Sequence, residues 1–202
     1  MPRPRTCSDE DILAAVGLLL GQKGAAGLTL AAVGRQVRLS PATLLQRFGS
    51  KKKLLQAFAD TAAEHARTPL RAAREAHPSV LWAIQQGLRA MRLHNGDTAP
   101  VAQGIAALRQ APNDPDLADA VARYTRGVRD ELDELLRAGV ETGELLPCDT
   151  RGLAEAAYAL WTGALLNAPL LSPDQDPIQS AERALNALLL PYRRPVFTHT
   201  QR

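Results

Sequence analysis

Residues 29–53 read TLAAVGRQVRLSPATLLQRFGSKKK, and this stretch decides which fold we expect. It holds six basic residues and no acidic residue. A run of cationic side chains on one segment indicates an anionic partner. The basic residues are Arg35, Arg38, Arg47, Lys51, Lys52 and Lys53.

Two short helices are predicted within this stretch. Thr29 is a suitable N-cap for a helix over residues 30–37, where apolar residues recur at helical spacing. Ser40 is a second N-cap and Pro41 fits the first helical position, so a second helix should cover residues 41–48. Two short helices joined by a three-residue turn form a helix-turn-helix.

The second of these helices is predicted to read DNA. In a helix-turn-helix, its N-terminal residues reach base edges in the major groove, while the first helix crosses the phosphate backbone. Gln can pair with adenine, Arg with guanine or phosphate, and the methyl groups of Ala and Thr with the thymine methyl. The side chains on the face away from the core are Ala42, Thr43, Gln46 and Arg47.

A third helix is predicted to begin after Ser50, and its first turn carries Lys51, Lys52 and Lys53. Lysines there lie at the positive end of the helix dipole, which costs up to about 0.3–1 kcal/mol each. A phosphate at this helix start removes the conflict and accepts hydrogen bonds from free backbone N–H groups. We therefore predict a phosphate contact by Lys51, whose loss in Lys51→Ala should reduce the salt slope of binding by roughly one.

The same residues resemble the DNA-binding domain of TetR-family transcriptional repressors. The resemblance covers roughly the first third of the chain and is only architectural beyond it. It implies a DNA-binding head, a homodimer and release from DNA by a small-molecule effector. It rests on Thr29 before Leu30-Ala31-Ala32-Val33, then Leu39-Ser40, Ala42-Thr43-Leu44, and Phe48-Gly49-Ser50-Lys51 followed by Leu54-Leu55.

Two positions depart from the family pattern. Arg38 occupies a turn position that is usually Gly, so a residue with a Cβ must fit a tight turn. Leu45 replaces a recognition-helix Tyr that usually touches a phosphate, which removes a hydroxyl donor. We expect the same docking mode, with Arg38 and Arg47 replacing the lost contact. The predicted DNA-binding residues are Thr29, Arg38, Ser40, Ala42, Thr43, Gln46, Arg47 and Lys51.

A further helix should precede this stretch and complete a three-helix head. Ser8 and Asp11 have capping-box spacing, and the apolar stripe that follows predicts a helix ending before Gly24. The lysine-tipped helix continues to about Arg67 and connects the head to the rest of the chain. Thr68-Pro69 marks its end, because the residue before proline is disfavoured in the helical region.

Charge separates the two predicted domains. Residues 1–67 contain 10 Lys and Arg against 5 Asp and Glu, whereas residues 68–202 contain 14 against 16. Only the N-terminal part is suited to polyanions. We therefore assign residues 1–67 to the DNA-binding domain with its connecting helix, and residues 68–202 to a C-terminal effector-binding and dimerisation domain.

Strand signals are almost absent from residues 68–202, where Pro or Gly separates runs rich in Ala, Leu and Arg. The fold class is therefore predicted to be all-α: a three-helix helix-turn-helix head followed by a helical ligand-binding and dimerisation domain. The expected helices cover residues 70–76, 79–93, 100–110, 115 to about 142, 150–167 and 177–190.

The last two helices carry broad apolar faces. Such faces indicate a four-helix interface with a second copy of the chain, as in the family that the head resembles. The alternative is the core of a monomer. The family also implies an effector pocket in this domain, lined by apolar and aromatic side chains; core packing is the alternative role for each. The pocket candidates are Trp82, Met91, Tyr124, Tyr158 and Trp161.

Enzyme chemistry is not indicated. Arginines lie three and four positions from a group of acidic residues on the longest helix, so a solvated face of ion pairs accounts for the group. No Ser-His-Asp order, phosphate-binding Gly loop or nucleophile elbow is visible, and we predict no catalytic, cofactor or metal site. The acidic residues are Asp130, Glu131, Asp133 and Glu134, and the arginines are Arg126, Arg129 and Arg137.

Cysteine usage and hydropathy suggest a cytoplasmic location. Cys7 and Cys148 are too few and too far apart for a disulfide framework or a cysteine metal site. The segment closest to a membrane span, residues 156–171, contains Asn167 and Pro169, so we interpret it as a buried helix.

The predicted function is sequence-specific binding of double-stranded operator DNA by a homodimer. We expect a transcriptional repressor whose two heads read a palindromic operator and which a small-molecule effector, not identified by the sequence, releases. The alternative is a helical interaction module whose basic patch binds an acidic protein partner.

Overall fold

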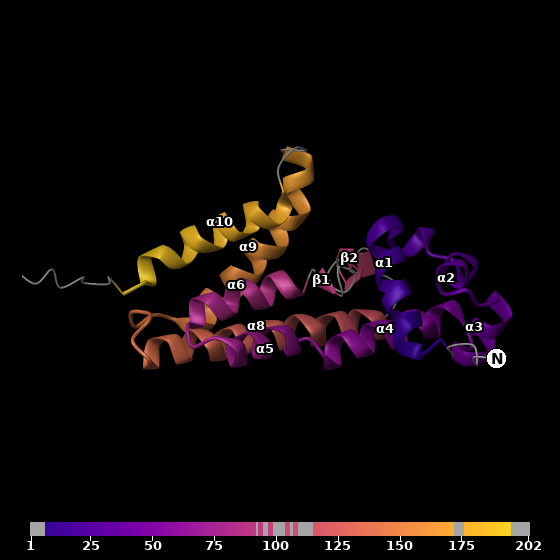
Figure 1. The fold of residues 1–202 in the computed structure, drawn as a ribbon, viewed down its shortest axis with the longest axis horizontal. Helices are drawn as coiled ribbons and strands as arrows, with labels where there is room; N and C mark the ends of the chain where they lie inside the picture. Colours follow the sequence, from indigo (N-terminus) through magenta and orange to yellow (C-terminus); the bar gives the residue numbers. More distant parts are fainter. Residues whose placement is uncertain are drawn as a thin grey trace, which may run out of the picture. The chain divides into compact units, whose positions relative to one another are not determined.

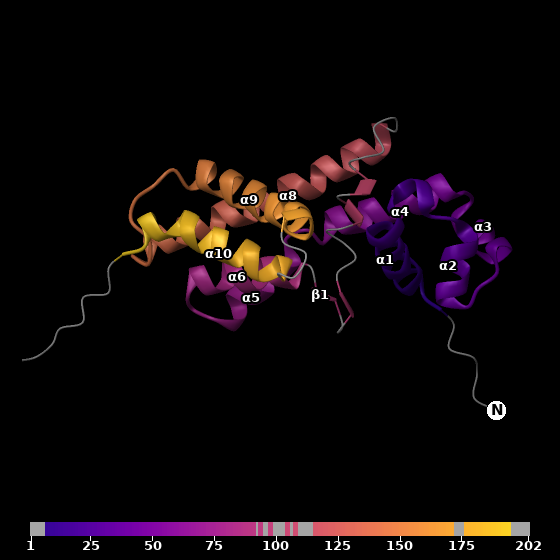
Figure 2. The ribbon, with the colours of Figure 1, turned by 90° about the horizontal axis from the view of Figure 1, so that it is seen from above.

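The computed structural model describes residues 7–91, 93–94, 97–98, 104–105, 107–108, 115–171 and 176–194. Helices dominate this part of the chain (Figures 1 and 2). Its strands are Leu93–His94 (β1) and Asp97–Thr98 (β2), which pair antiparallel with Leu93 opposite Thr98. The predicted all-α class is confirmed.

The chain forms two compact units. The first comprises Met1–Ala66 and Ala90–Gly127, and the second comprises Arg67–Arg89 and Val128–Arg202. Residues 90–127, which we assigned to the C-terminal domain, thus group with the head. The division into functional domains at residues 67 and 68 stays a prediction.

Four helices of the first unit form the head, and side-chain caps define where they start. Ser8 forms a capping box with Asp11. The hydroxyls of Thr29, Ser40 and Ser50 each accept a hydrogen bond from the backbone N–H three residues later in the sequence. The first helix is interrupted at Gly24, where φ is 67°. The helices are α1 (Asp9–Gly27), α2 (Leu30–Val37), α3 (Pro41–Phe48) and α4 (Lys51–Glu64).

The core of the head lies where these four helices meet. Its side chains recur at helical spacing and are almost fully buried, which is the amphipathic pattern expected from the sequence. Burial of this apolar surface is the main force that holds helices of only eight residues in place. The central side chains are Ile12, Val16, Leu20, Leu28, Val33, Leu44, Leu54 and Phe58.

A short helical segment, of which residues 104–105 and 107–108 are described, packs directly on the head. A Cβ built on Gly104 would lie 2.8 Å from Phe58 Cζ in α4 and 3.4 Å from Gly17 Cα in α1. A side chain at residue 104 would therefore push this segment away from the crossing of α1 and α4. This contact explains why residues beyond 90 group with the head.

Several predicted boundaries differ from the structure. The first helix runs past Gly24 to Gly27, and the helix expected over residues 150–167 extends to Leu171. Helix α4 ends at Glu64 rather than near Arg67. Helix α5 (Thr68–Ala76) begins before the proline, because Pro69 occupies its first turn, where its missing N–H has no helical partner to lose. Helix α6 (Val80–Ala90) ends before Leu93, which pairs in β1 instead.

The second unit contains α5, α6, the second half of α8 (Pro115–Glu141), α9 (Thr150–Leu171), α10 (Pro177–Leu189) and the short η1 (Leu190–Tyr192). Helices α9 and α10 lie side by side in both views (Figures 1 and 2). Apolar side chains from these helices, and from the connection between α8 and α9, form the core of the unit. They include Leu70, Val80, Ile84, Leu88, Leu132, Leu136, Leu145, Leu153, Trp161, Ala181 and Leu185.

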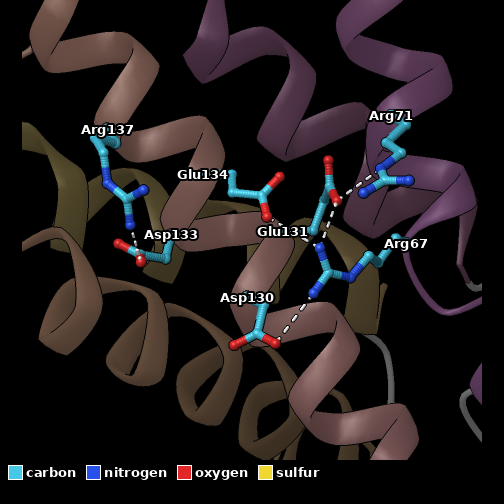
Figure 3. Close-up of polar contacts among 7 residues, drawn as sticks. All are labelled: Arg67, Arg71, Asp130, Glu131, Asp133, Glu134 and Arg137. Carbon is cyan, nitrogen blue, oxygen red and sulfur yellow. Dashed lines mark hydrogen bonds and ion pairs between the residues drawn. The ribbon is translucent and has the colours of Figure 1, made fainter.

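The acidic residues on α8 do not form the solvated, within-helix network that we predicted. Of the four residues in the predicted group, Asp130, Glu131, Asp133 and Glu134, only Asp133 has an ion pair within the helix, at 2.5 Å from Arg137. Arg67 lies 3.1 Å from Asp130 and 3.0 Å from Glu134, so these pairs join α8 to the start of α5 (Figure 3). The prediction was wrong because partners more than 60 residues away cannot be found from helical spacing.

Glu131 is the one buried charged residue among those whose burial is described, with 5% of its surface exposed. Its carboxylate accepts a hydrogen bond of 2.8 Å from Arg71 Nε and lies 3.7 Å from Arg67 (Figure 3). Burying a carboxylate is unfavourable unless a cation accompanies it. Arg71 and Arg67 therefore fix which face of α8 meets α5.

No helix in the described residues has both the length and the apolar character that crossing a membrane requires.

Candidate DNA-binding interface

The turn between α2 and α3 is built around a left-handed arginine. Arg38 has φ 57° and ψ 39°, and among the described residues it is the one non-glycine residue with positive φ. The N–H groups of Arg38 and Leu39 both point to the carbonyl oxygen of Gly34, the latter at 2.9 Å. Arg38 thus takes the backbone conformation expected of the glycine that it replaces.

Gly34 makes this turn possible. A Cβ at residue 34 would lie 2.4 Å from the carbonyl oxygen of Leu39, which is closer than any real contact allows. The space that the turn needs is therefore provided four residues before Arg38. Sequence reasoning overlooked Gly34, although its position one helical turn before the departure from the family pattern was a usable signal.

The start of the recognition helix α3 is fixed locally. Ser40 Oγ accepts the N–H of Thr43 at 3.0 Å, the two hydroxyls lie 2.8 Å apart, and Pro41 occupies the first turn. This arrangement needs no contact with the rest of the head. The predicted cap and the predicted bounds of α3 are both confirmed.

The outer face of α3 carries the predicted base-reading side chains. Ala42 and Gln46 are exposed and Thr43 is half-buried, whereas Leu44 is fully buried. Leu45, at the position usually held by a tyrosine, leaves 45% of its surface exposed. The surface for a groove is thus present, with an apolar side chain where a hydroxyl donor was lost.

Arg47 does not extend freely from this face. Its guanidinium lies 2.5 Å from the Asp9 carboxylate and donates a hydrogen bond of 2.8 Å to the Cys7 carbonyl oxygen. Asp9 lies in the first turn of α1 and Cys7 lies directly before the N-cap of that helix, about 40 residues earlier in the sequence than Arg47. No local pattern links such positions, which is why sequence reasoning missed Asp9 and Cys7.

Lys51 also has an intramolecular partner. Its Nζ donates a hydrogen bond of 3.0 Å to the Ala25 carbonyl oxygen, in the last turn of α1, and the side chain is half-buried. Lys53 of the same helical turn is exposed. The cation that we predicted to hold a phosphate therefore compensates a carbonyl group near the end of α1.

The predicted DNA-binding residues lie on α2, the turn, α3 and the first turn of α4. Thr29 and Arg38 are exposed, and the Thr29 hydroxyl is occupied by its capping bond to Ala32 N–H. Contact between these residues and DNA stays a prediction.

The five pocket candidates do not share one environment. Trp82 is 36% exposed and stacks on the His77 ring, with centroids 4.7 Å apart. Tyr158 and Trp161, three positions apart on α9, are buried in the second unit. The remaining two, Met91 and Tyr124, are buried in the first unit. Their role in binding an effector stays a prediction.

Two family models match the chain. Residues 12–58 match the bacterial regulatory proteins of the tetR family. Residues 90–190 match the C-terminal domain of BetI-type transcriptional repressors. Comparison with curated protein sequences found no match.

Several solved structures share the fold of this chain. Escherichia coli NemR in its reduced form has a TM-score of 0.75 at 20% identity, over 93% of this chain and 98% of that chain. A TetR-family regulator from Agrobacterium tumefaciens has a TM-score of 0.76 at 19% identity, covering 92% and 97%. A protein from Saccharomonospora viridis, crystallised with choline, has a TM-score of 0.76 at 16% identity, covering 93% and 98%.

The fold and the head thus define a helix-turn-helix transcriptional regulator. The chain belongs to the TetR family. It is a DNA-binding regulator of transcription, and release by a small-molecule effector is typical of its family. Duplex DNA is therefore favoured over the acidic protein partner that we considered as an alternative.

Proposed function

We propose that this protein is a homodimeric repressor, active in the cytoplasm, that binds a palindromic operator and leaves it when a small molecule binds. The main observation in support of this proposal is the exposed outer face of α3. This helix follows a well-defined turn and belongs to a head with exposed basic residues. The match to BetI-type transcriptional repressors supports repression rather than activation. Catalysis is not expected, since the family generally binds DNA without turnover.

In the proposed interface, Gln46, Thr43 and Ala42 contact base edges, because they are the polar and small side chains on the outer face of α3. Thr29 and Ser40 lie at the starts of α2 and α3, where backbone N–H groups can bind phosphate. Arg38 adds a cation within the turn. These contacts provide both position and sequence preference.

The proposed dimer forms through α9 and α10. In the single chain, Leu153, Ala157 and Trp161 of α9 are buried, but another face of the same helix is open. Ala156 and Ala159 are exposed on that face, and a Cβ at Gly163 would meet nothing within 4 Å. Small residues at this spacing let a second helix approach closely, which favours a second copy of the chain.

The effector is proposed to bind among aromatic side chains of the C-terminal region. The relative from S. viridis was crystallised with choline, and aromatic rings attract quaternary ammonium groups. Tyr158 and Trp161 offer two such rings on one helix. Choline is therefore the first ligand to test.

A footprinting experiment on the DNA flanking the protein's own gene tests the proposal. The full-length protein should protect a palindrome, and choline or another small molecule should abolish the protection. Gln46→Ala should lose discrimination at one base pair of each half-site by about 1–3 kcal/mol, with little effect elsewhere. Gln36→Ala, on the exposed surface of α2, is the control. Unchanged discrimination in Gln46→Ala would contradict the proposed role of α3.

A further inference from the structure

Arg47 was predicted to contact DNA, but its guanidinium is already bound within the head. We infer that Arg47 is a positioning residue: through Asp9 and Cys7 it holds the end of the recognition helix to the start of α1, and it does not contact phosphate. We call the contacts of Arg47 with Asp9 and Cys7 the α1–α3 link. The inference rests on the proposed DNA interface and concerns how α3 is presented to it.

The α1–α3 link joins two well-fixed ends. Asp9 lies in the first turn of α1, between the two residues of the capping box, in which Ser8 N–H donates to Asp11 at 2.9 Å and Asp11 N–H donates to Ser8 at 3.1 Å. Arg47 lies in the last turn of α3, where the Gly49 N–H closes the helix on the Leu45 carbonyl at 2.8 Å. Only the side chains of Arg47 and Asp9 have to be ordered when the link forms.

The recognition helix needs such a second attachment. Among its eight residues only Leu44 is fully buried, and Phe48 is half-buried. One buried side chain leaves rotation of a short helix about its own axis weakly restrained, since hydrophobic contacts are not directional. The two directed contacts of Arg47 restrain that rotation and thereby the direction in which Gln46 points.

The charges favour the same interpretation. The Arg47 guanidinium lies 2.5 Å from the Asp9 carboxylate, whose negative charge cancels much of the attraction of Arg47 for phosphate. The exposed fractions of the two side chains are 30% for Arg47 and 62% for Asp9. A phosphate contact would require breaking two existing interactions. If Arg47 acts only as a link, DNA binding requires no free energy to form or to break the Arg47–Asp9 pair, because the pair is already present.

The inference is testable because it predicts a change in DNA affinity opposite to the one that charge alone predicts. Asp9→Asn removes a negative charge from a DNA-binding head, which on electrostatic grounds alone should strengthen binding. If Asp9 acts through the α1–α3 link, the same change should weaken binding, because α3 must be reoriented on the DNA. The loss cannot exceed the contribution of one exposed ion pair, so we expect roughly a three- to fivefold weaker affinity.

The experiment uses the full-length protein and an operator duplex that the unmodified protein selects from a random-sequence pool. Glu10→Gln removes the same charge from the same exposed turn of α1 and is the matched control. It should bind as tightly as the unmodified protein or more tightly. Circular dichroism of each variant checks that the helices are retained.

The variant Arg47→Gln distinguishes a role of Arg47 in orienting α3 from a direct contact between Arg47 and a DNA phosphate. Its affinity should fall by about the same factor as that of Asp9→Asn, with the slope of log affinity against log salt unchanged, whereas a lost phosphate contact lowers the slope by about 0.9. The double variant Asp9→Asn/Arg47→Gln should be no weaker than either single variant, since both lose the same link.

Two results would overturn the inference: Asp9→Asn binding as tightly as Glu10→Gln, or a salt slope reduced by about 0.9 in Arg47→Gln. Failure of the unmodified protein to select any duplex would instead contradict the proposed DNA interface. The two failures are therefore distinguishable.

Discussion

At the residue scale, Arg38 is the most informative position. A left-handed conformation costs a residue with a Cβ roughly 1–2 kcal/mol, yet Arg38 adopts it with φ 57°. The surrounding contacts that enforce it are the two N–H groups held by the Gly34 carbonyl. The head thus carries local strain beside its proposed DNA surface.

Arg38→Gly should therefore stabilise the protein. Relief of roughly 1–2 kcal/mol of strain exceeds the roughly 0.4–1 kcal/mol that glycine's extra freedom costs in the unfolded chain, so we expect a net gain of about 0.5–1 kcal/mol in the free energy of unfolding. Urea unfolding measures this gain. Arg38→Ala keeps the Cβ and should show no gain; equal stabilisation in both variants would contradict the strain.

The Cys7 thiol should report on Arg47. Burial raises the pKa of this thiol above its usual value, Asp11 adds to the increase, and Arg47 opposes it. Less thiolate is then present at any given pH, so alkylation by iodoacetamide should require a more alkaline pH than for a free cysteine. Arg47→Gln removes the opposing positive charge and should raise the Cys7 pKa further, so the pH at which Cys7 is alkylated should increase.

Cys148 provides the internal control for that measurement. Burial, followed by Asp149, raises the pKa of its thiol, and Arg47 does not contribute. Peptide mapping of the alkylated protein separates the two thiols. A Cys7 profile that does not respond to Arg47→Gln would show that the guanidinium does not lie beside Cys7.

At the scale of elements, the start of α4 is attached to the end of α1 by Lys51, whereas Lys52 and Lys53 of the same turn are exposed. Lys53→Ala should reduce the salt slope of operator binding by about 0.9, whereas Lys51→Ala should leave the slope unchanged and lower the unfolding midpoint. This expectation replaces the phosphate contact that the sequence predicted for Lys51. A reduced slope for Lys51→Ala alone would restore the earlier prediction.

The attachment of α5 to α8 depends on a buried carboxylate. Arg71→Ala should lower the free energy of unfolding by about 1–2 kcal/mol, less than for a fully buried pair, because Arg71 is 55% exposed and Arg67 remains near Glu131. Glu134→Gln removes an exposed partner of Arg67 and should cost less than about 0.5 kcal/mol. Thermal unfolding of the two variants compares them, and equal midpoints would contradict the role of Glu131.

Local signals in the sequence predicted the elements well. Caps at Thr29, Ser40 and Ser50 place three helix starts where the structure has them. Contacts between distant elements could not be predicted in this way. Arg47 and Lys51 contact residues of α1, and Arg71 contacts a residue of α8. These contacts depend on how the helices pack, and they have no regular separation in the sequence that could be recognised.

At the scale of the whole molecule, recognition of a palindrome requires two heads that act on one face of DNA. In a helix-turn-helix dimer, the half-sites are spaced by whole helical turns, about 10–10.5 base pairs each, because each recognition helix must meet a major groove. The exposed small-residue face of α9 and the apolar residues of α10 are the proposed means of joining the two chains.

The most direct test is the affinity of the full-length protein for its selected operator before and after insertion of about 5 base pairs, half a helical turn, at the centre. Affinity should fall to that of a single half-site, because the second half-site then faces away from its recognition helix. Equal affinity for both duplexes would contradict paired reading of DNA by two α3 helices.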